Sequence, residues 1–507
     1  FLGIFRNRLL ASTFGASAEL DAYFAAFRLP DFIYNILIAG GIVVAFLPLF
    51  GEYFKENKEK AWGFVNNVLD VFLVLLISIS IIFFIITPFL VDLIAPGFEG
   101  AQRSLTILLT RIMFLSPILL GLSSVFSGIV QYFDRFLVYS LCPIFYNLGI
   151  IIGIIFLSPK FGILGVSFGV ILGALLHFLI KIPAAFSCGF NFEWKLNFKS
   201  RRIKKLFYLM IPRTIGVAAE QINILVMTAI ASILATGSVS IFNFAKHLYS
   251  FPIGIAGVSF AISAFPTLSK TFIKEKEEEF KILFINTFKK VFFLAVPAVF
   301  ILFGLRNNIV SVVLKTGEFT VEASKLTSAT FGILSLALFG AALVPLLFRA
   351  FFALKDTFTP TLITISIVIL NVILAFTFIK LINNYSILNN WIRNLFQLKE
   401  IEDISILGLA IAFFLTIYFK FFLLLFFLKR KINYKFDFDF VKILGAGLIS
   451  VFGLIIAFKF TGTFKELIFG ILFYSLLYFG LTILFGLKEP KKIIYFLNNK
   501  LIKNGKN

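Results

Sequence analysis

The stretch AAFRLPDFIYNILIAGG, from Ala25 to Gly41, is mostly apolar, yet it carries Arg28, Pro30 and Asp31 near its start. Apolar runs of about eighteen residues or more recur along the chain. The 507 residues are 60% hydrophobic, include 71 phenylalanines and have a mean hydropathy of +0.99. The solvent for such a chain is lipid, where every backbone polar group needs a partner inside the protein. Because the runs are continuous rather than alternating, they predict an all-α polytopic membrane protein.

Fourteen spans are expected, and the loops between them separate into two sets by charge. The expected spans are 1–14, 21–50, 61–88, 104–130, 138–157, 162–187, 206–235, 239–268, 283–305, 322–350, 359–380, 404–428, 440–460 and 465–487. One set of loops is rich in Lys and Arg: Lys55–Lys60, Lys195–Lys205, Lys270–Lys281, Lys429–Lys435 and the tail from Lys488. The other set is nearly neutral or acidic: Ala16–Asp21, Ala95–Arg103 and Ala235–Ser240. Basic loops stay in the cytoplasm, so we expect both termini there.

The net charge of +21 does not indicate a nucleic-acid partner, because the basic residues gather in these few loops. Only two cysteines occur, Cys142 and Cys188, both near expected spans, so neither a disulfide nor a Cys-based metal site is expected. The chain begins at Phe1 inside an apolar helix, and we therefore expect further residues before it.

Four pairs of segments indicate an internal repeat. The pairs are Ala11–Arg28 with Ala231–Lys246, Val43–Leu49 with Ala261–Leu268, CPIFYN (Cys142–Asn147) with TPTLIT (Thr359–Thr364), and ILGVSFG (Ile163–Gly169) with ILGLAIA (Ile406–Ala412). Any one match is explained by chance similarity among apolar helices, but four in the same order favour a repeat. An even number of spans separates the units, so both have the same orientation, as in transporters that bind substrate between parallel halves.

The repeat and the charge pattern give the expected organisation of the chain. Residues 1–190 form an N-terminal six-helix bundle with a truncated first helix, and 206–430 form a C-terminal six-helix bundle. A basic cytoplasmic linker, 191–205, joins them. The final two helices, 431–487, and a basic cytoplasmic tail, 488–507, have no counterpart in the repeat.

Charges within the spans are the candidate binding residues, because polar groups at membrane depth usually face a cavity or a partner. The candidates are Arg6, Asp21, Arg28, Asp31, Glu220, Gln221, Lys246 and His247, with Arg213 and Asn223 on the same span as Glu220. Together they suggest a cation-lined cleft that accepts an anionic head group, since guanidinium binds phosphate with two hydrogen bonds at once. The alternative is a set of structural ion pairs, such as Arg28 with Asp31 three residues later, or of interfacial anchors such as Arg111. We interpret His177 as a hydrogen-bonded structural residue.

The chain resembles the lipid II flippases (the MurJ/MviN family) of the MOP exporter superfamily over nearly its whole length. The resemblance is carried by Phe1–Phe54, Ile211–Lys270, LKTGEFT (Leu314–Thr320) and FRAFFALKDTFTPT (Phe348–Thr361). It implies fourteen helices, arranged as two six-helix bundles and a final pair whose groove holds a lipid tail. It also implies export of an undecaprenyl-diphosphate-linked peptidoglycan precursor by alternating access, in the bacterial cytoplasmic membrane.

The resemblance also implies which residues meet the diphosphate. Arg6 matches an essential family arginine, and Asp21 and the basic Arg28 match as well. The chain departs from the family pattern at four positions. Tyr34 and His247 stand where arginines are usual, Asn7 replaces an acidic residue, and Ala39 replaces a glutamate. Lys246, beside His247, supplies part of the missing positive charge. Tyr34 thereby joins the expected cavity residues.

Three other functions remain open from the sequence. One is export of another polyprenyl-linked saccharide or of a drug within the same superfamily, and another is a scaffold that has lost transport. The third is a membrane-embedded glycosyl- or phosphotransferase, for which Asp437 and Asp439 are the paired carboxylates, although a loop and helix cap explains them better. We expect no enzymatic activity, cofactor or metal. The expected partners are a lipid-linked anionic saccharide, membrane lipid, a coupling ion and cell wall synthesis proteins, for a chain that acts as a monomer.

Overall fold

The structure is a computed structural model that describes residues 2–36, 43–273, 276–434, 439–458 and 464–490. Within these ranges the regular structure is helical and contains no strand. Helices run through the described part of each of the fourteen expected spans. Nine helices, or runs of two or three consecutive helical segments, in the described chain are long and apolar enough to cross a membrane. Val217–Ser232 and Ile468–Leu484 are shorter apolar segments.

Packing divides the chain into two compact units. The first contains residues 1–243 and 316–323, and the second contains 244–315 and 324–507. The helix that follows the basic linker therefore packs with the first unit, although the repeat places it in the second bundle. Packing and repetition are different properties of a chain, so the expected bundle boundaries stay a prediction.

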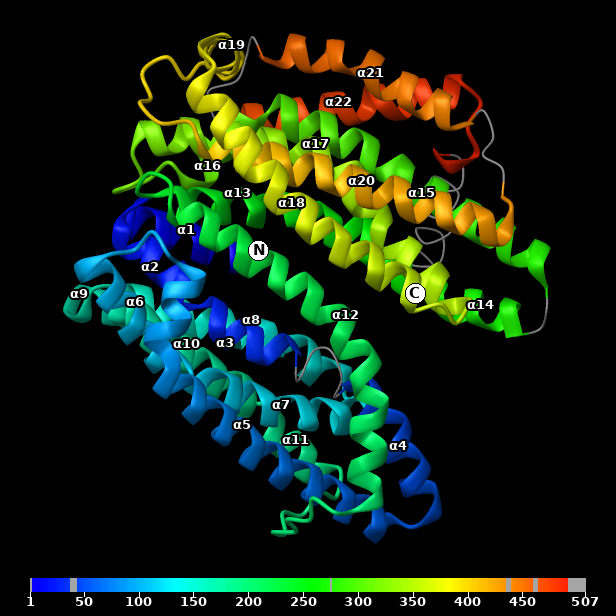
Figure 1. Cartoon of the computed structure of the whole chain (residues 1–507). Coiled ribbons are helices and arrows are strands. Elements are labelled where there is room, and N and C mark those ends of the chain that lie inside the picture. Colours follow the sequence, from blue (N-terminus) through cyan, green and yellow to red (C-terminus); the bar gives the residue numbers. More distant parts are fainter. Residues whose placement is uncertain (1, 37–42, 274–275, 435–438, 459–463, 491–507) are drawn as a thin grey trace. The chain divides into compact units, whose positions relative to one another are not determined.

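The first unit, blue to green in Figure 1, holds thirteen helical segments and the starts of two further helices, α13 and α17. The thirteen segments are α1 (Leu2–Phe14), α2 (Ala18–Ala26), α3 (Arg28–Tyr34), α4 (Val43–Glu56), α5 (Lys58–Ile94), α6 (Gly100–Met113), α7 (Leu115–Tyr132), α8 (Phe136–Ile152), the π-helical η2 (Gly153–Leu157), α9 (Ser158–Phe161), α10 (Ile163–Leu179), α11 (Lys181–Ser187) and α12 (Arg201–Ser232).

Proline sets the position of three helix breaks in this unit. A proline ring clashes with the carbonyl four residues earlier and cannot donate a hydrogen bond to it. The residue four before each proline is the last residue of a helix: Ala26 before Pro30, Met113 before Pro117, and Leu179 before Pro183. The expected single span 21–50 therefore begins as two helices, α2 and α3. At the second break the hydroxyl of Ser116 donates to the Met113 carbonyl at 2.8 Å and satisfies one freed acceptor.

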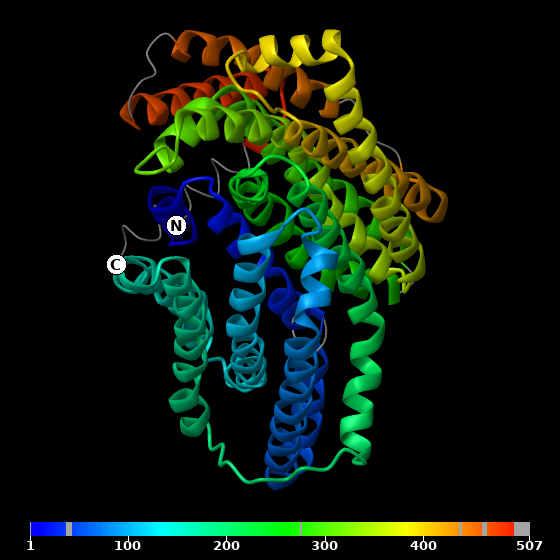
Figure 2. The ribbon, with the colours of Figure 1, turned by 60° about the vertical axis from the view of Figure 1, so that its left-hand side comes forward.

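The basic linker, residues 191–205, is held against α5 by hydrogen bonds. Figure 2 shows it crossing from the end of α11 to the start of α12, past one end of α5. Asn67 binds Asn197 in both directions, with its Nδ2 donating to the Asn197 carbonyl at 3.1 Å and its Oδ1 accepting from the Asn197 amide at 2.8 Å. Asp70 accepts from the backbone amide of Lys195. Where α12 starts, Lys205 donates to Glu52 of α4 at 3.0 Å, which raises the pKa of Lys205.

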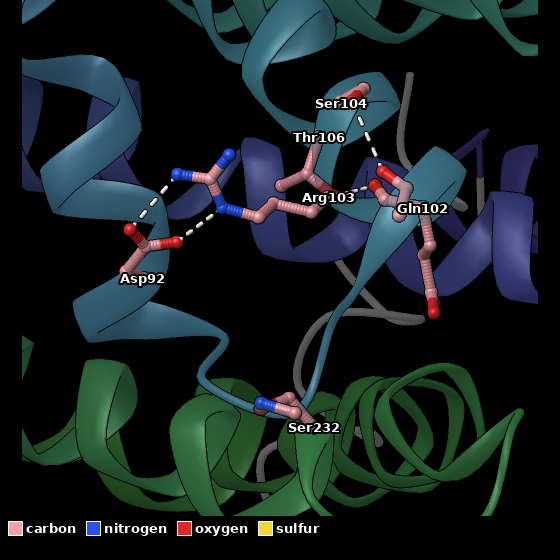
Figure 3. A network of polar contacts seen from close by, with 8 residues as sticks. Asp92, Gln102, Arg103, Ser104, Thr106 and Ser232 are labelled. Atoms are coloured by element: carbon pink, nitrogen blue, oxygen red, sulfur yellow. Dashed lines mark hydrogen bonds and ion pairs between the residues drawn. The ribbon is translucent and has the colours of Figure 1, made fainter.

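A polar network fixes the turn between α5 and α6 (Figure 3). Arg103 donates to Asp92 with two guanidinium nitrogens, at 2.5 and 2.9 Å, and so closes the turn on itself. The amide of Gly97, within the turn, donates to the hydroxyl of Ser232 at the end of α12 at 3.2 Å. Gln102 donates to the Ala18 carbonyl at the start of α2 at 3.0 Å. The connection between α5 and α6 is thus bonded to two helices that are distant in sequence, α2 and α12.

Helices α8 and α10 approach so closely that their facing positions exclude side chains. A Cβ atom added to Gly149 would lie 2.2 Å from the backbone nitrogen of Gly173, and one added to Gly153 would lie 2.5 Å from Cα of Gly169. Small residues allow this approach in membranes, where van der Waals packing rather than water drives helix association.

The second unit holds most of α13 (Ser238–Pro252) and ten further segments. These are η3 (Ile253–Val258), α14 (Ser259–Ile273), α15 (Glu277–Gly304), α16 (Arg306–Leu314), α17 (Val321–Ala353), α18 (Phe358–Asn384), α19 (Ser386–Phe396), α20 (Ile406–Ile432), α21 (Asp439–Phe458) and α22 (Phe464–Leu484).

The final pair, α21 and α22, is attached to α15 by buried polar contacts. The hydroxyl of Tyr478 in α22 donates to the Phe293 carbonyl of α15 at 2.9 Å. Tyr474 donates to the Gly447 carbonyl of α21 at 3.2 Å and so joins the two helices of the pair to each other. Lys289 of α15, which is buried, pairs with Asp439 at 3.1 Å at the first residue of α21. These contacts hold the pair in place without any loop connection to α15.

The glycine contact gives a testable prediction for the first unit. Gly149→Ala forces a methyl group against the backbone of α10, and overpacking of this kind costs about 1–3 kcal/mol. We expect a lower thermal unfolding midpoint in detergent. Gly480→Ala is the matched control, because a Cβ there meets nothing within 4 Å. Equal midpoints for the two variants would show that α8 and α10 are not in close contact.

Candidate functional site

The nine residues expected to line the cavity fall in both packing units. The first unit contains seven of them: Arg6 in α1, Asp21 in α2, Arg28, Asp31 and Tyr34 in α3, and Glu220 and Gln221 in α12. Lys246 and His247, in α13, belong to the second unit.

Arg28 is half-buried at the start of α3, and its partners are far away in sequence. Its Nε donates to Thr228 Oγ1 of α12 at 3.0 Å, and its Nη2 donates to Asn243 Oδ1 of α13. Both partners are buried. Among the described residues the guanidinium makes no direct ion pair with Asp31, although the two charges interact. The spacing of three residues permits an ion pair between Arg28 and Asp31. Arg28 instead donates hydrogen bonds to Thr228 and Asn243, which are distant in sequence.

Asp31 lies in the field of two cations, first Arg28 and then Arg6. Tyr23 of α2 and Tyr146 of α8 interact with the charges of both Arg6 and Asp31. We call these five residues the Arg6–Asp31 cluster: Arg6, Tyr23, Arg28, Asp31 and Tyr146. It brings together α1, α2, α3 and α8, with two positive charges, one negative charge and two phenols.

Arg6 is bonded to its neighbour in the sequence, and Tyr34 adjoins the cluster. Arg6 donates to Oδ1 of its neighbour Asn7 from Nε at 3.3 Å and from Nη2 at 3.1 Å. Because Asn7 is neutral, this contact orients Arg6 without cancelling its charge. Tyr34 interacts with Asp31 and with Ser124 of α7, at the edge of the cluster. The cluster therefore carries a net positive charge inside an apolar bundle, which suits an anionic ligand.

Asp21 has a different position, as the cap of α13. Its carboxylate accepts from the backbone amide of Gly237 at 2.7 Å, and from the amide and hydroxyl of Ser240 at 2.7 and 2.5 Å. The side chain is only 2% exposed. A carboxylate at a helix N-terminus satisfies orphan amides and complements the helix dipole. Gly237 has φ +89° and a Cβ there would lie 2.5 Å from the Ala16 carbonyl oxygen, so the turn requires glycine.

The remaining expected residues lie on α12 and α13. Glu220 is exposed and Gln221 is half-buried, about two turns before Thr228, the partner of Arg28. Lys246 and His247 are half-buried and stand three and four residues after Asn243. Residues at this spacing share one face of a helix.

The structure also places charged residues that the cavity hypothesis left aside. Arg111 lies over the Phe84 ring at 4.9 Å, as an interfacial anchor does. Sequence reasoning missed Lys181, which is 1% exposed and donates to Ser127 Oγ at 2.6 Å and to Ser123 Oγ at 2.9 Å. Ser123 Oγ also contacts His177 Nδ1 at 2.9 Å. His177 is thus hydrogen-bonded, in a group that ties α7 to α10 and α11.

Sequence reasoning also missed Tyr23 and Tyr146. Tyr146 lies within the repeated CPIFYN segment, the one signal that could have identified it.

Some expectations concern positions outside the described residues. These are Ala39, the side chain of Arg213, and Asp437. Asp439, its predicted partner in a carboxylate pair, is described and is bound by Lys289. In the described parts of the chain no three His, Cys, Asp or Glu side chains gather as a metal site would require.

Comparison with known proteins gives a consistent family. A model of the family described as "Lipid II flippase MurJ" matches residues 10–478. The "Probable lipid II flippase MurJ" of Buchnera aphidicola subsp. Schizaphis graminum is 28% identical over 472 residues, which cover 91% of this chain and 88% of the relative. The "Lipid II flippase MurJ" of Burkholderia cenocepacia is 26% identical over 391 residues, covering 75% of this chain and 76% of the relative.

Solved structures agree with this result. "Lipid II flippase MurJ, inward closed conformation" has a TM-score of 0.77 and 26% identity, and the match covers 96% of each chain. An inward-facing multidrug resistance MATE family transporter of the MOP superfamily has a TM-score of 0.71 with 14% identity, over 85% of this chain and 94% of that one. The second likeness shows the fold alone. The expectation of an all-α polytopic membrane fold is confirmed.

The contacts of Asp21 predict that its main contribution is to stability. Asp21→Asn places an amide NH₂ against backbone donors in a buried site, and lost hydrogen bonds to a charged group cost about 1.5–3 kcal/mol each. We expect a clearly lower unfolding midpoint in detergent. The control is Glu19→Gln, an exposed carboxylate on the same helix. An unchanged midpoint for Asp21→Asn with loss of transport would instead make Asp21 a substrate ligand.

Proposed function

Because the chain belongs to the lipid II flippase family MurJ, we propose that it exports lipid II across the bacterial cytoplasmic membrane. Lipid II is the peptidoglycan precursor linked to undecaprenyl diphosphate. The observation that carries the proposal is the family match over residues 10–478, which includes nearly every helix described above. The chain is a multi-pass protein of the bacterial inner membrane.

The Arg6–Asp31 cluster supports a binding site for the diphosphate within the first unit. Among the described residues Arg6 donates hydrogen bonds only to neighbouring Asn7, so further guanidinium N–H groups remain for a ligand. An arginine fork binds two phosphate oxygens at once. The single anion Asp31 offsets part of the cluster's charge when the site is empty and leaves a net attraction for the diphosphate.

Arg28 has a second role in this proposal, because its hydrogen bonds to Thr228 and Asn243 are already formed. It contributes a fixed positive field and holds α3 against α12 and α13. Lys246 and His247 share a face of α13 with Asn243 and add cationic character along that helix. In the family, arginines are usual at the positions of Tyr34 and His247. Arg28, Lys246 and His247 replace part of that positive charge in this chain.

Alternating access is the transport mechanism that we propose for this arrangement. The polar head group crosses with the protein while the polyprenyl tail stays in lipid. The final helix pair α21 and α22, apolar in sequence after the charged residues near the start of each helix, is the proposed path of the tail. The membrane potential is one energy source, since moving one charge through 100 mV is worth about 2.3 kcal/mol. A coupled ion is the other.

The proposed orientation places both termini in the cytoplasm. It is supported by the basic end of α20, where Lys429, Arg430 and Lys431 occupy the last turn. The linker that precedes α12 carries Lys195 and Lys199, and Arg201 and Arg202 follow at the start of α12. By contrast, the α5–α6 turn on the other side pairs its Arg103 with Asp92.

Two other functions are less well supported. Export of a different polyprenyl-linked saccharide is favoured only by Tyr34 and His247, which depart from the family pattern. A transferase requires free paired carboxylates, and Asp439 is instead bound to Lys289 at 3.1 Å.

Transport by the reconstituted full chain tests the proposal. In proteoliposomes that hold fluorescent lipid II, we expect the wild type to move it between leaflets, as measured by its accessibility to a membrane-impermeant quencher. Arg6→Gln removes a charged donor, and we expect a roughly tenfold lower rate, since a charged hydrogen bond is worth about 1.5–3 kcal/mol.

The matched control is Arg111→Gln, which removes an arginine that lies on the Phe84 ring of the same unit. Its rate should equal that of the wild type, and both variants should keep the wild-type unfolding midpoint. If wild-type protein moves other polyprenyl-diphosphate saccharides but not lipid II, the exporter alternative is correct. If Tyr34→Arg then gave the protein transport of lipid II, the arginine usual at this position in the family would be the determinant of substrate choice.

A further inference from the structure

Helix α19 presents an apolar surface that the described chain leaves uncovered. Ile387, Trp391 and Leu395 are 86%, 61% and 47% exposed. They are spaced four residues apart and therefore form one stripe along the helix. Asn390 and Asn394, also exposed, lie on the adjoining side of the same helix. The exposed surface of α19 thus has an apolar half and a polar half.

The opposite side of α19 is held firmly by the second unit. Ile392 is 2% exposed, and the Phe396 ring lies 5.2 Å from the guanidinium of Arg306. Arg393 donates to the carbonyls of Leu398, Ile401 and Glu402, and so folds the following loop back onto the helix. The apolar stripe is therefore presented in a fixed direction by a helix that is itself well packed.

The chain connections place α19 at the membrane surface. Only Tyr385 separates it from α18, which ends at Asn384, and α20 begins at Ile406. Both neighbours are long and apolar enough to cross a membrane. Figure 1 shows α19 at the end of the bundle where α18 ends and α20 begins. The other end of α20 carries Lys429, Arg430 and Lys431, so α19 is on the side away from the basic, cytoplasmic loops.

We propose that α19 is an interfacial helix whose apolar stripe inserts into the outer leaflet of the membrane. The occupant of the stripe is a lipid surface, because the helix is tethered within one residue of a membrane span and has one apolar and one polar exposed side. Helices with this pattern lie in the interface with the apolar side among the acyl chains. Trp391 and the exposed Tyr385 are the residue types that favour the headgroup level. The assignment is independent of the transported substrate.

The consequence is an anchor at one end of the second unit. Helix α19 packs against the end of α18, and its following loop leads directly into α20. Insertion of the stripe therefore fixes the outer ends of both spans at the depth of the lipid headgroups. The depth of this end of the unit in the membrane would therefore stay constant while a substrate is transported.

Trp391 is a natural reporter, since the chain has only three tryptophans, the others being Trp62 and Trp194. In the Trp62→Phe/Trp194→Phe variant, reconstituted in liposomes, we expect lipids brominated near the headgroup to quench roughly half or more of the emission. Lipids brominated at the chain ends should quench less. Subtracting the signal of Trp391→Phe from that of the wild type gives the same readout if the double variant does not fold.

The matched control moves the reporter to the polar side of α19. Asn390→Trp, in a chain that carries phenylalanine at 62, 194 and 391, should be quenched by aqueous acrylamide and weakly by brominated lipid. If Trp391 behaves in the same way, the stripe faces water and the proposal is overturned. If Trp391 is protected from both quenchers, the stripe is covered by protein instead of lipid, which also overturns it.

Discussion

The absence of water in the hydrocarbon core is the constraint on which this structure depends. Every backbone amide and carbonyl must find a partner within the protein, so the chain is helical wherever it crosses. The constraint also explains how the exceptions are handled. Where Pro30, Pro117 and Pro183 remove a donor, the helix ends four residues earlier and a new one begins at once. Ser116 shows how a side chain satisfies a carbonyl that such a break sets free.

The helical class and the location of every described span were predictable from hydropathy, because long apolar runs leave few alternatives. The breaks were not predicted: Pro30 stands out in the sequence, yet 21–50 was treated as one span, which begins as α2 and α3. Helices α16 and α19 were not expected, since neither is long enough to cross a membrane. Their presence follows from packing, such as the contact of Arg306 with Phe396, which no local pattern encodes.

The candidate site was harder to predict for the same reason. Hydropathy correctly singled out Arg28 and Asp21 as charges that need partners, but those partners lie 200 or more residues away in sequence. The tempting local pair, Arg28 with Asp31, is not formed directly among the described residues. Asp21 was assigned to a cavity and is bonded to the start of α13. Lys181 was overlooked because two serines, rather than an acid, satisfy it.

The course of the chain between the packing units has a practical consequence. Helix α13 begins in the first unit, where Asp21 and Arg28 form hydrogen bonds with its first two turns, and continues into the second. The segment 316–323 then returns to the first unit, with the Glu318 amide bonded to the Ser12 carbonyl at 2.9 Å. A cut within the basic linker would therefore leave α12 on the C-terminal fragment, although α12 packs with the first unit. The N-terminal fragment would lack α12, the start of α13 and residues 316–323, whereas the second unit would lie wholly on the C-terminal fragment. Split versions of this transporter are therefore best divided elsewhere.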